Sequence, residues 1–286
     1  MSLIVQKYGG SSLADLDKIR LVASRVKKYG DEGHELVVVV SAMGKTTDQL
    51  ISLAKNLNPF PPERELDMLL STGEQVSISL LAIALSSLGV KSVSLTGGQA
   101  GIITTDTYTK AKIFHIDTRR IKELLLNHQV VIVAGFQGRT PQGDITTLGR
   151  GGSDITACAL AAALDADFCE IYTDVRGVFT ADPHLVPQAQ KIARLSYEEM
   201  SEMATLGAKV LQPRAVDFSQ AYGVRVHVRS TFSEEEGTWV EELNNMEEVR
   251  VKAITHSGDM LKIVLLGVPN QPGVAAQIFK ALSDFS

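Results

Sequence analysis

The most informative stretch of the sequence is Thr147-Leu148-Gly149-Arg150-Gly151-Gly152-Ser153-Asp154, which leads directly into an apolar run at residues 155–164. Glycines at the start of a helix free backbone N–H groups, which attract negative charge together with the helix N-terminus. An arginine can bind a carboxylate or phosphate through two parallel hydrogen bonds. The stretch therefore predicts an anion-binding loop that opens a helix. A glycine-rich turn with a solvated arginine is the alternative.

Length and composition place the chain in a broad class. Its 286 residues, 44% of them hydrophobic, are enough for a large core and more than one domain. The formal net charge of -5 gives no basic surface, so nucleic-acid binding is not expected. We find neither a basic and apolar signal segment nor an apolar run of about 18 residues. A cytoplasmic protein with no membrane partner is expected.

The two cysteines carry no sign of special chemistry. Cys158 falls in a helical apolar stripe and Cys169 beside a predicted strand. A thiol in such a position usually packs as a small hydrophobic group. We therefore expect neither a disulfide nor a metal cluster, and no residue is assigned as a direct metal ligand.

The N-terminal segment reads as a strand, a glycine turn and a helix. Residues 3–8 predict the strand and residues 15–29 the helix, with Gly9-Gly10-Ser11-Ser12 between them. This order is typical of a phosphate cradle, and Lys7 at the end of the strand could reach the same phosphates. An ordinary turn with a surface lysine is the alternative.

A second strand delivers hydroxyl groups to the same kind of position. Residues 36–40 are apolar and β-branched, which is typical of a strand buried on both faces of a parallel sheet. The following segment resembles a Walker A loop, but Val39 stands where that motif needs its first glycine. Ser41 and Thr47 are instead expected at the strand's carboxyl end, where α/β proteins bind ligands. Capping of the next helix remains open for either.

A long helical region over residues 63–88 carries one isolated acidic residue in its apolar part. The pattern is interrupted at Ser71-Thr72-Gly73, and Glu74 follows among apolar neighbours. A buried carboxylate needs a partner because an unpaired buried charge is costly. A ligand group is one such partner. A surface position on the polar stripe is the alternative.

Two further segments suggest a nucleotide site. The strand at residues 168–173 ends in a polar loop, which closes with a proline and could hold a base and ribose. Lys209 lies near the start of a helix predicted over residues 208–222, where a cation opposes the helix dipole. An anionic ligand would relieve that conflict. A solvated loop and a surface lysine are the alternatives.

The pattern restarts near residue 249. A strand at residues 261–268, a turn at residues 270–273 and a helix at residues 274–282 follow, without a strand to complete the unit. An uncovered edge of this kind cannot make a stable sheet alone. We expect a truncated chain, or pairing with another chain.

Taken in order, these motifs resemble aspartate kinases over nearly the whole chain. The motifs are residues 7–12, residues 149–154, Thr173-Asp174, residues 179–183 and residues 209–214. The resemblance implies a catalytic amino-acid-kinase domain over residues 1–232, a three-layer sandwich of helices around a mainly parallel sheet. It further implies a linker at residues 233–248 and the start of an ACT-type α+β regulatory module at residues 249–286. Family members continue through at least a second ACT module, so a complete effector site is not expected here.

The activity implied by the resemblance is transfer of the ATP γ-phosphoryl group to the side-chain carboxylate of L-aspartate. This is the first step of lysine, threonine and methionine biosynthesis, with ATP and Mg²⁺ as cofactors. A homodimer or higher oligomer through the ACT region, and lysine or threonine as effector, would follow. The implied catalytic residues are Lys7, Asp154 and Lys209. The implied aspartate site comprises Ser41, Thr47, Glu74, Arg150, Gly151, Gly152 and Ser153. The implied nucleotide site comprises Lys7, Gly9, Gly10, Ser11, Thr173, Asp174, Phe179, Asp182, Lys209 and Val210.

Two other functions remain open at this point. One is a kinase for another acceptor, such as glutamate or a nucleoside monophosphate. Glu74 opposes the nucleotide acceptor, because a carboxylate there would repel a phosphate. The other is a non-catalytic subunit that senses amino acids. Lys7, Asp154 and Lys209 argue against it, because a pure sensor has no use for lysines that face phosphate.

Overall fold

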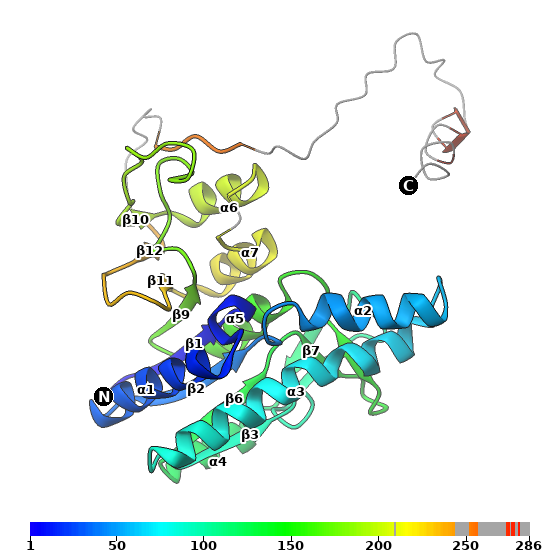
Figure 1. Ribbon diagram of the computed structural model, residues 1–286, viewed down its shortest axis with the longest axis horizontal. Helices are drawn as coiled ribbons and strands as arrows, with labels where there is room; N and C mark the ends of the chain where they lie inside the picture. Colours follow the sequence, from blue (N-terminus) through cyan, green and yellow to red (C-terminus); the bar gives the residue numbers. More distant parts are fainter. Residues whose placement is uncertain (209, 244–251, 257–272, 275, 278–279, 281–286) are drawn as a thin grey trace. The chain divides into compact units, whose positions relative to one another are not determined.

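The computed structural model describes residues 1–208, 210–243, 252–256, 273–274, 276–277 and 280. The chain forms two compact units, Met1–His256 and Ser257–Ser286. The helices and strands with defined bounds all lie in the first unit. Figure 1 shows that unit coloured along the sequence.

A mainly parallel sheet forms the middle of the first unit, as the sequence predicts. Its strands run in the order β10-β12-β11-β9-β1-β2-β6-β3, and only the β11–β12 pair is antiparallel. The central strand β1 pairs in parallel with β2 on one side and β9 on the other. The bounds are β1 Leu3–Tyr8, β2 Glu35–Val40, β3 Ser92–Leu95, β6 Val130–Ala134, β9 Phe168–Thr173, β10 Arg194–Leu195, β11 Val226–Ser230 and β12 Thr238–Val240.

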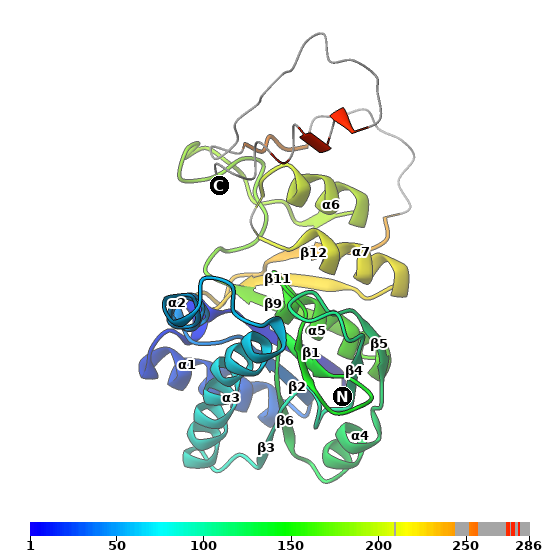
Figure 2. The ribbon, with the colours of Figure 1, turned by 90° about the vertical axis from the view of Figure 1, so that its right-hand side faces the viewer.

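Helices cover both faces of this sheet. Figure 2 shows α1 and α3 on one side of the strands, and α4 and α5 on the other. The alternation along β2 explains the layers: Val37 and Val39 pack in one core, and Leu36, Val38 and Val40 in the other. This confirms the three-layer sandwich. The helices are η1 Gly10–Leu13, α1 Leu16–Asp31, α2 Thr46–Leu57, α3 Glu63–Ser87, α4 Arg119–Leu126, α5 Gly152–Leu164, α6 Tyr197–Thr205 and α7 Pro213–Tyr222.

A second, smaller sheet lies beside the loop of residues 148–151, here called the Arg150 loop. It has the order β5-β4-β7-β8, with β4 Ile102–Thr104, β5 Ile113–Ile116, β7 Gln137–Arg139 and β8 Ile145–Thr147. The antiparallel β7–β8 pair is a hairpin, as the proline and glycine of residues 135–144 indicate. The strands β4 and β5 are too short to give a sequence pattern. This sheet delivers the chain to Leu148 and the loop that follows.

The helix α3 corrects one expectation, because it runs unbroken from Glu63 to Ser87. Gly73 does not interrupt it. A Cβ added at Gly73 would lie 2.9 Å from the Cβ of Ala42, so the missing side chain allows close packing of α3 on the loop after β2. Gly73 therefore serves tertiary packing here and leaves the helix intact.

By length and composition alone, α3 could also cross a membrane. This corrects the expectation that no apolar stretch is long enough. However, α3 packs against α1, α2 and the central sheet. It also buries Asp67 and Glu74 on its inner face. Those contacts are typical of a core helix in a globular unit.

The start of α7 also differs from the sequence prediction. The helix begins at Pro213 rather than near residue 208, with the proline in its first turn. Proline suits that position because its missing N–H would have no partner in the helix anyway. Lys209 therefore precedes the helix in sequence, and the argument from the helix dipole does not apply to it. Lys209 itself lies outside the described residues.

Two domain predictions concern the C-terminal segments, namely a linker at residues 233–248 and an ACT region at residues 249–286. Within the segment 233–248, expected as a linker, Thr238–Val240 forms β12 and joins the main sheet between β10 and β11. The first compact unit extends to His256. Most of the expected ACT region at residues 249–286 lies outside the described residues, so that assignment stays a prediction.

Candidate active site

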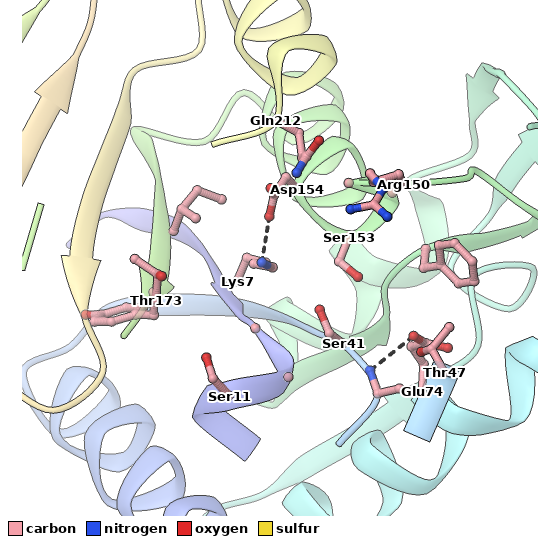
Figure 3. Close-up of a pocket in the computed structure, with 18 of the residues that line it drawn as sticks. Lys7, Ser11, Ser41, Thr47, Glu74, Arg150, Ser153, Asp154, Thr173 and Gln212 are labelled. Carbon is pink, nitrogen blue, oxygen red and sulfur yellow. Dashed lines mark hydrogen bonds and ion pairs between the residues drawn. The ribbon is translucent and has the colours of Figure 1, made fainter. Parts of the chain in front are cut away.

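A pocket of about 390 Å³ opens at the carboxyl ends of β1, β2 and β9. In open parallel sheets, ligands bind at this edge of the strands. Loops after the three strands, the middle of α3, the start of α5 and the segment before α7 supply its walls. Figure 3 shows how the side chains converge.

Most of the residues predicted from the sequence line this one pocket. They are Lys7, Gly9, Gly10, Ser11, Ser41, Thr47, Glu74, Arg150, Gly151, Gly152, Ser153, Asp154, Thr173 and Val210. Three predicted nucleotide-site residues do not line it, namely Asp174, Phe179 and Asp182. The prediction for Lys209 falls outside the described residues.

Lys7 and Asp154 form an ion pair in the pocket. The Lys7 Nζ lies 2.6 Å from the Asp154 Oδ1, and the two side chains are only 13% and 8% exposed. The pair arises because β1 ends beside the first turn of α5, where an acidic residue is favoured by the helix dipole. Apart from this ion pair, Asp154 Oδ1 has no hydrogen-bond partner in the described part of the chain. Both groups therefore keep capacity for a further ligand.

Glu74 presents a second buried carboxylate, and it is only 2% exposed. Its Oε1 accepts a hydrogen bond of 3.1 Å from the Ala42 backbone N–H, made possible by the close packing at Gly73. Its Oε2 is buried without a hydrogen-bond partner among the described residues. Burial raises the pKa of Glu74 to about 7, and the Ala42 N–H opposes that rise. A cationic ligand would relieve the unpaired oxygen and favour the ionised carboxylate.

Several other side chains that line the pocket are donors without an internal partner in the described part of the chain. Arg150 is exposed and lines the pocket. No hydrogen bond or ion pair joins its guanidinium to the described residues. Ser41, Thr47 and Ser153 also line the pocket, and none of their hydroxyls is hydrogen-bonded within the described ranges. These groups can therefore bind a polar ligand without first breaking an internal contact.

Several lining residues were missed by the sequence analysis, among them Gln212 and Phe136. Gln212 directly precedes Pro213, and recognising that proline as the first residue of a helix would have placed Gln212 at a loop facing the sheet edge. Phe136 has a left-handed backbone with φ of 67°, which is rare outside glycine. The Phe136 N–H donates to Thr156 Oγ1 and its carbonyl accepts from the Leu148 N–H. No pattern in the sequence signals that conformation.

The remaining predicted nucleotide residues belong to the loop after β9. Thr173 lines the pocket, and its hydroxyl donates to Asp174 Oδ1 over 2.9 Å. Further along, Phe179 pairs with Lys191 in an isolated bridge, and Asp182 accepts from the His184 backbone N–H. Their roles stay predictions, because the pocket does not reach them.

The charged side chains in the pocket form two groups. In Figure 3, the Lys7–Asp154 pair lies between Thr173 on one side and Ser41, Thr47, Glu74 and Arg150 on the other. One end thus offers a carboxylate and a guanidinium, which match an ammonium and a carboxylate. The middle offers a lysine, glycine N–H groups and a helix start, which match phosphate. The pocket can hold an amino acid and a phosphorylated ligand side by side.

Comparison with known proteins agrees with this arrangement. The model of the amino acid kinase family matches residues 2–230. An aspartokinase of Thermus thermophilus is 52% identical over 284 residues, which cover 99% of this chain and 70% of that protein. The aspartate kinase structure from Synechocystis has a TM-score of 0.77 and 46% identity, with 99% of this chain and 48% of that chain covered.

A more distant enzyme has been solved with ligands. The structure of E. coli aspartokinase III in complex with aspartate and ADP has a TM-score of 0.78 and 27% identity, and covers 99% of this chain and 74% of that chain. A second structure of the same enzyme, with lysine and aspartate, has a TM-score of 0.82. Sequence and fold agree over almost the full length of this chain, which belongs to the amino acid kinase family and, within it, to the aspartokinases.

Proposed function

We propose that the protein transfers the γ-phosphoryl group of ATP to the side-chain carboxylate of L-aspartate, giving 4-phospho-L-aspartate and ADP. The observation that supports this most directly is the buried, unpaired Glu74 Oε2 in the pocket that Arg150 also lines. A carboxylate and a guanidinium together select the zwitterionic end of an amino acid. The aspartate kinase relatives point to the same substrate.

The chemistry makes few demands on the protein. The aspartate carboxylate, with an ordinary pKa of about 3.9, is ionised at neutral pH and needs no general base. One of its oxygens attacks the γ-phosphorus while the bond from that phosphorus to the β,γ-bridging oxygen breaks. ADP leaves with the electron pair of that bond. The protein must therefore position two anions and neutralise their charge, which dominates catalysis of phosphoryl transfer.

The phosphate end of the pocket suits that task. Lys7 would bind the transferring phosphoryl group, with Gly9, Gly10 and Ser11 as backbone and hydroxyl donors. Asp154 would orient Lys7 through their ion pair. Lys209 is proposed as a second phosphate ligand on sequence grounds alone. Thr173 and Val210 would contact the nucleotide, since both line the pocket. The same role is proposed for Asp174, Phe179 and Asp182 from the sequence.

The acceptor end would bind the backbone groups of L-aspartate. Arg150 would hold its α-carboxylate and Glu74 its ammonium group. The hydroxyls of Ser41, Thr47 and Ser153, with the glycines Gly151 and Gly152, would complete the polar wall. This leaves the side-chain carboxylate directed toward Lys7 and the phosphate.

Mg²⁺ fits this site through a single protein carboxylate. Asp154 offers a carboxylate whose Oδ1 is held in the described part of the chain by the Lys7 ion pair, and no cluster of three or more acidic, histidine or cysteine side chains there could cage a metal. Mg²⁺ prefers one or two carboxylates, with substrate phosphates and waters as its other ligands. Asp154 would hold the ion through water, and the ion would neutralise charge on the ATP phosphates.

Regulation and assembly belong to the same proposal. One structure of E. coli aspartokinase III contains lysine, which supports an amino-acid effector for the full-length protein, either lysine or threonine. We propose a homodimer or higher oligomer through the ACT region, and a cytoplasmic location.

The decisive test is consumption of ATP in the presence of L-aspartate, with the acyl phosphate trapped by hydroxylamine as the hydroxamate. We expect hydroxamate with L-aspartate and little with L-glutamate. A preference for L-glutamate would replace the acceptor. Binding of L-aspartate without any turnover would favour the sensing subunit, which the intact Lys7–Asp154 pair argues against.

A further inference from the structure

Asp67 is a buried carboxylate that the proposed mechanism does not use. It lies on α3, seven residues before Glu74, and is completely buried. Seven residues make nearly two helical turns, so both side chains project from the same face of α3, about 10 Å apart along its axis. Asp67 does not line the pocket.

Three hydrogen bonds converge on this carboxylate, all from segments beside the Arg150 loop. Asp67 Oδ2 accepts from the backbone N–H of Thr109 at 2.9 Å and of Thr147 at 2.8 Å. Asp67 Oδ1 accepts from the Thr147 hydroxyl at 2.6 Å. Thr147 ends β8, three residues before Arg150. The carboxylate therefore ties α3 directly to the strand that carries the loop.

The contact with Thr109 reaches the same loop from its other side. Thr109 has a left-handed backbone with φ of 62°, a conformation that is costly for a β-branched residue. Its carbonyl oxygen would lie 3.0 Å from a Cβ at Gly149, and Gly149 itself has φ of 75°. By holding the Thr109 N–H, Asp67 stabilises a turn that packs against the first glycine of the loop.

We propose that Asp67 is a positioning residue for the acceptor amino acid, which sets the location of Arg150 relative to Glu74. This rests on the proposed function, since it takes Arg150 and Glu74 as ligands of the same amino acid. The helix α3 is the rigid spacer. Glu74 anchors it to the loop after β2 through Ala42, and Asp67 anchors it to the end of β8 through Thr147.

A carboxylate suits this position because every neighbour within hydrogen-bond distance is a donor. Hydrogen bonds to an ionised acceptor are about twice as strong as neutral ones. Burial raises the pKa of Asp67, while the bonds from Thr147 and Thr109 lower it. An apolar side chain would leave the N–H groups of Thr109 and Thr147 unsatisfied, and an asparagine would keep the shape but replace one acceptor oxygen with an NH2 group, which can only donate.

The sharpest test uses Thr147, because replacing it removes one bond and leaves Asp67 in place. For Thr147→Val we expect the L-aspartate KM to rise about tenfold, as for loss of one buried hydrogen bond. The ATP KM should stay within about twofold. Thr147→Ser, which keeps the hydroxyl, should restore the aspartate KM. Asp67→Asn should resemble Thr147→Val.

Thr146→Val is the matched control. Thr146 is the preceding residue of β8, and its hydroxyl is equally buried against that of Thr104, with 2.5 Å between the oxygens. Its loss should lower the melting temperature as Thr147→Val does and leave both KM values unchanged. A Thr147→Val enzyme with a lower melting temperature but unchanged aspartate KM would overturn the proposal. So would an equal rise in both KM values.

Calorimetry of L-aspartate binding in the absence of ATP separates this proposal from the proposed function. If the wild-type protein binds L-aspartate but forms no hydroxamate, the assigned reaction fails while Asp67 can still be tested. Weaker binding by Thr147→Val, with Thr147→Ser and Thr146→Val unchanged, would then support the positioning role. Equal binding by all four proteins would overturn it.

Discussion

At the scale of single residues, Arg150 is the most exposed part of the proposed acceptor site. It has no partner among the described residues, so its removal should not disturb the fold. We expect Arg150→Ala to raise the L-aspartate KM by about 100-fold, as for loss of a bidentate carboxylate contact, with little change in the ATP KM. Arg64→Ala is a control, because Arg64 pairs with Asp144 outside the pocket. Equal losses for both substrates would contradict the assignment.

Lys7 should act on the rate rather than on binding of the amino acid. Lys7→Met removes the cation from the phosphate end and leaves Asp154 without its ion-pair partner. We expect a folded protein whose kcat is lower by about two to three orders of magnitude, as for loss of one donor to transition-state charge. Steady-state turnover measures the loss of kcat, and circular dichroism checks that the variant is folded. Lys27→Met, at an exposed surface pair with Asp31, is the control. Turnover near the wild-type value would exclude Lys7 from the transition state.

Glu74 should give the free protein a measurable pH dependence. Its pKa is raised from 4.5 to about 7. At pH values between 4.5 and about 7, Glu74 is protonated in the folded protein and ionised in the unfolded chain. The unfolding free energy should therefore fall as the pH rises through this range, by at most about 3 kcal/mol. L-aspartate should show the opposite trend and bind more tightly as Glu74 ionises. Denaturant titrations and calorimetry across this pH range measure both. Glu74→Gln should remove both trends, and their persistence would assign them to another group.

The sequence could predict which residues belong to the site, but not their hydrogen bonds or backbone conformations. Lys7, Glu74 and Arg150 stand out because their chemistry contrasts with the apolar or glycine-rich neighbours. That Glu74 keeps one unpaired oxygen depends on how closely α3 approaches Ala42, which no local pattern encodes. The left-handed Phe136 is likewise imposed by its contacts with Thr156 and Leu148.

At the scale of elements, α3 is where local sequence and tertiary packing disagree. Glycine weakens helices, so Gly73 suggests a break, yet the helix continues because the sheet and α2 hold it. The strands 36–40 and 130–134 were predictable because burial on both faces leaves continuous apolar runs. The start of α7 could not be predicted, because the segment before Pro213 is also compatible with a helix.

Gly73→Ala tests the close approach of α3. Alanine would stabilise an isolated helix by about 1 kcal/mol. Here its Cβ would lie 2.9 Å from Ala42, where overpacking typically costs about 1–3 kcal/mol. We therefore expect net destabilisation, and a higher aspartate KM because Glu74 moves with the helix. Thr72→Ala, at an exposed position next to it, should show neither effect. Stabilisation by Gly73→Ala would mean that the contact is loose.

At the scale of the whole molecule, the pocket is assembled from segments far apart in sequence. Periodicity predicts the strands, and the rule that ligands bind at their carboxyl ends predicts which loops meet. The distances within the pocket follow only from the crossing of α3 over the sheet and from the small sheet beside it. Hence most predicted residues line one pocket, whereas Asp174, Phe179 and Asp182 do not. These three residues belong to the loop after β9, whereas the pocket is lined by the end of that strand, including its last residue, Thr173.

Binding of L-aspartate should stabilise the molecule as a whole, because the ligand would join Glu74 on α3 to Arg150 on the loop before α5. At 100 times its dissociation constant, a ligand that binds only the folded state adds about 2.7 kcal/mol of stability. In a protein of this size, that should raise the melting temperature by about 5–10 °C. Thermal denaturation with L-aspartate, and with D-aspartate as the matched control, measures the shift. Because the stabilisation needs both anchors, Glu74→Gln and Arg150→Ala should each reduce it at the same ligand concentration. A shift that survives in both variants would place the amino acid elsewhere on the protein.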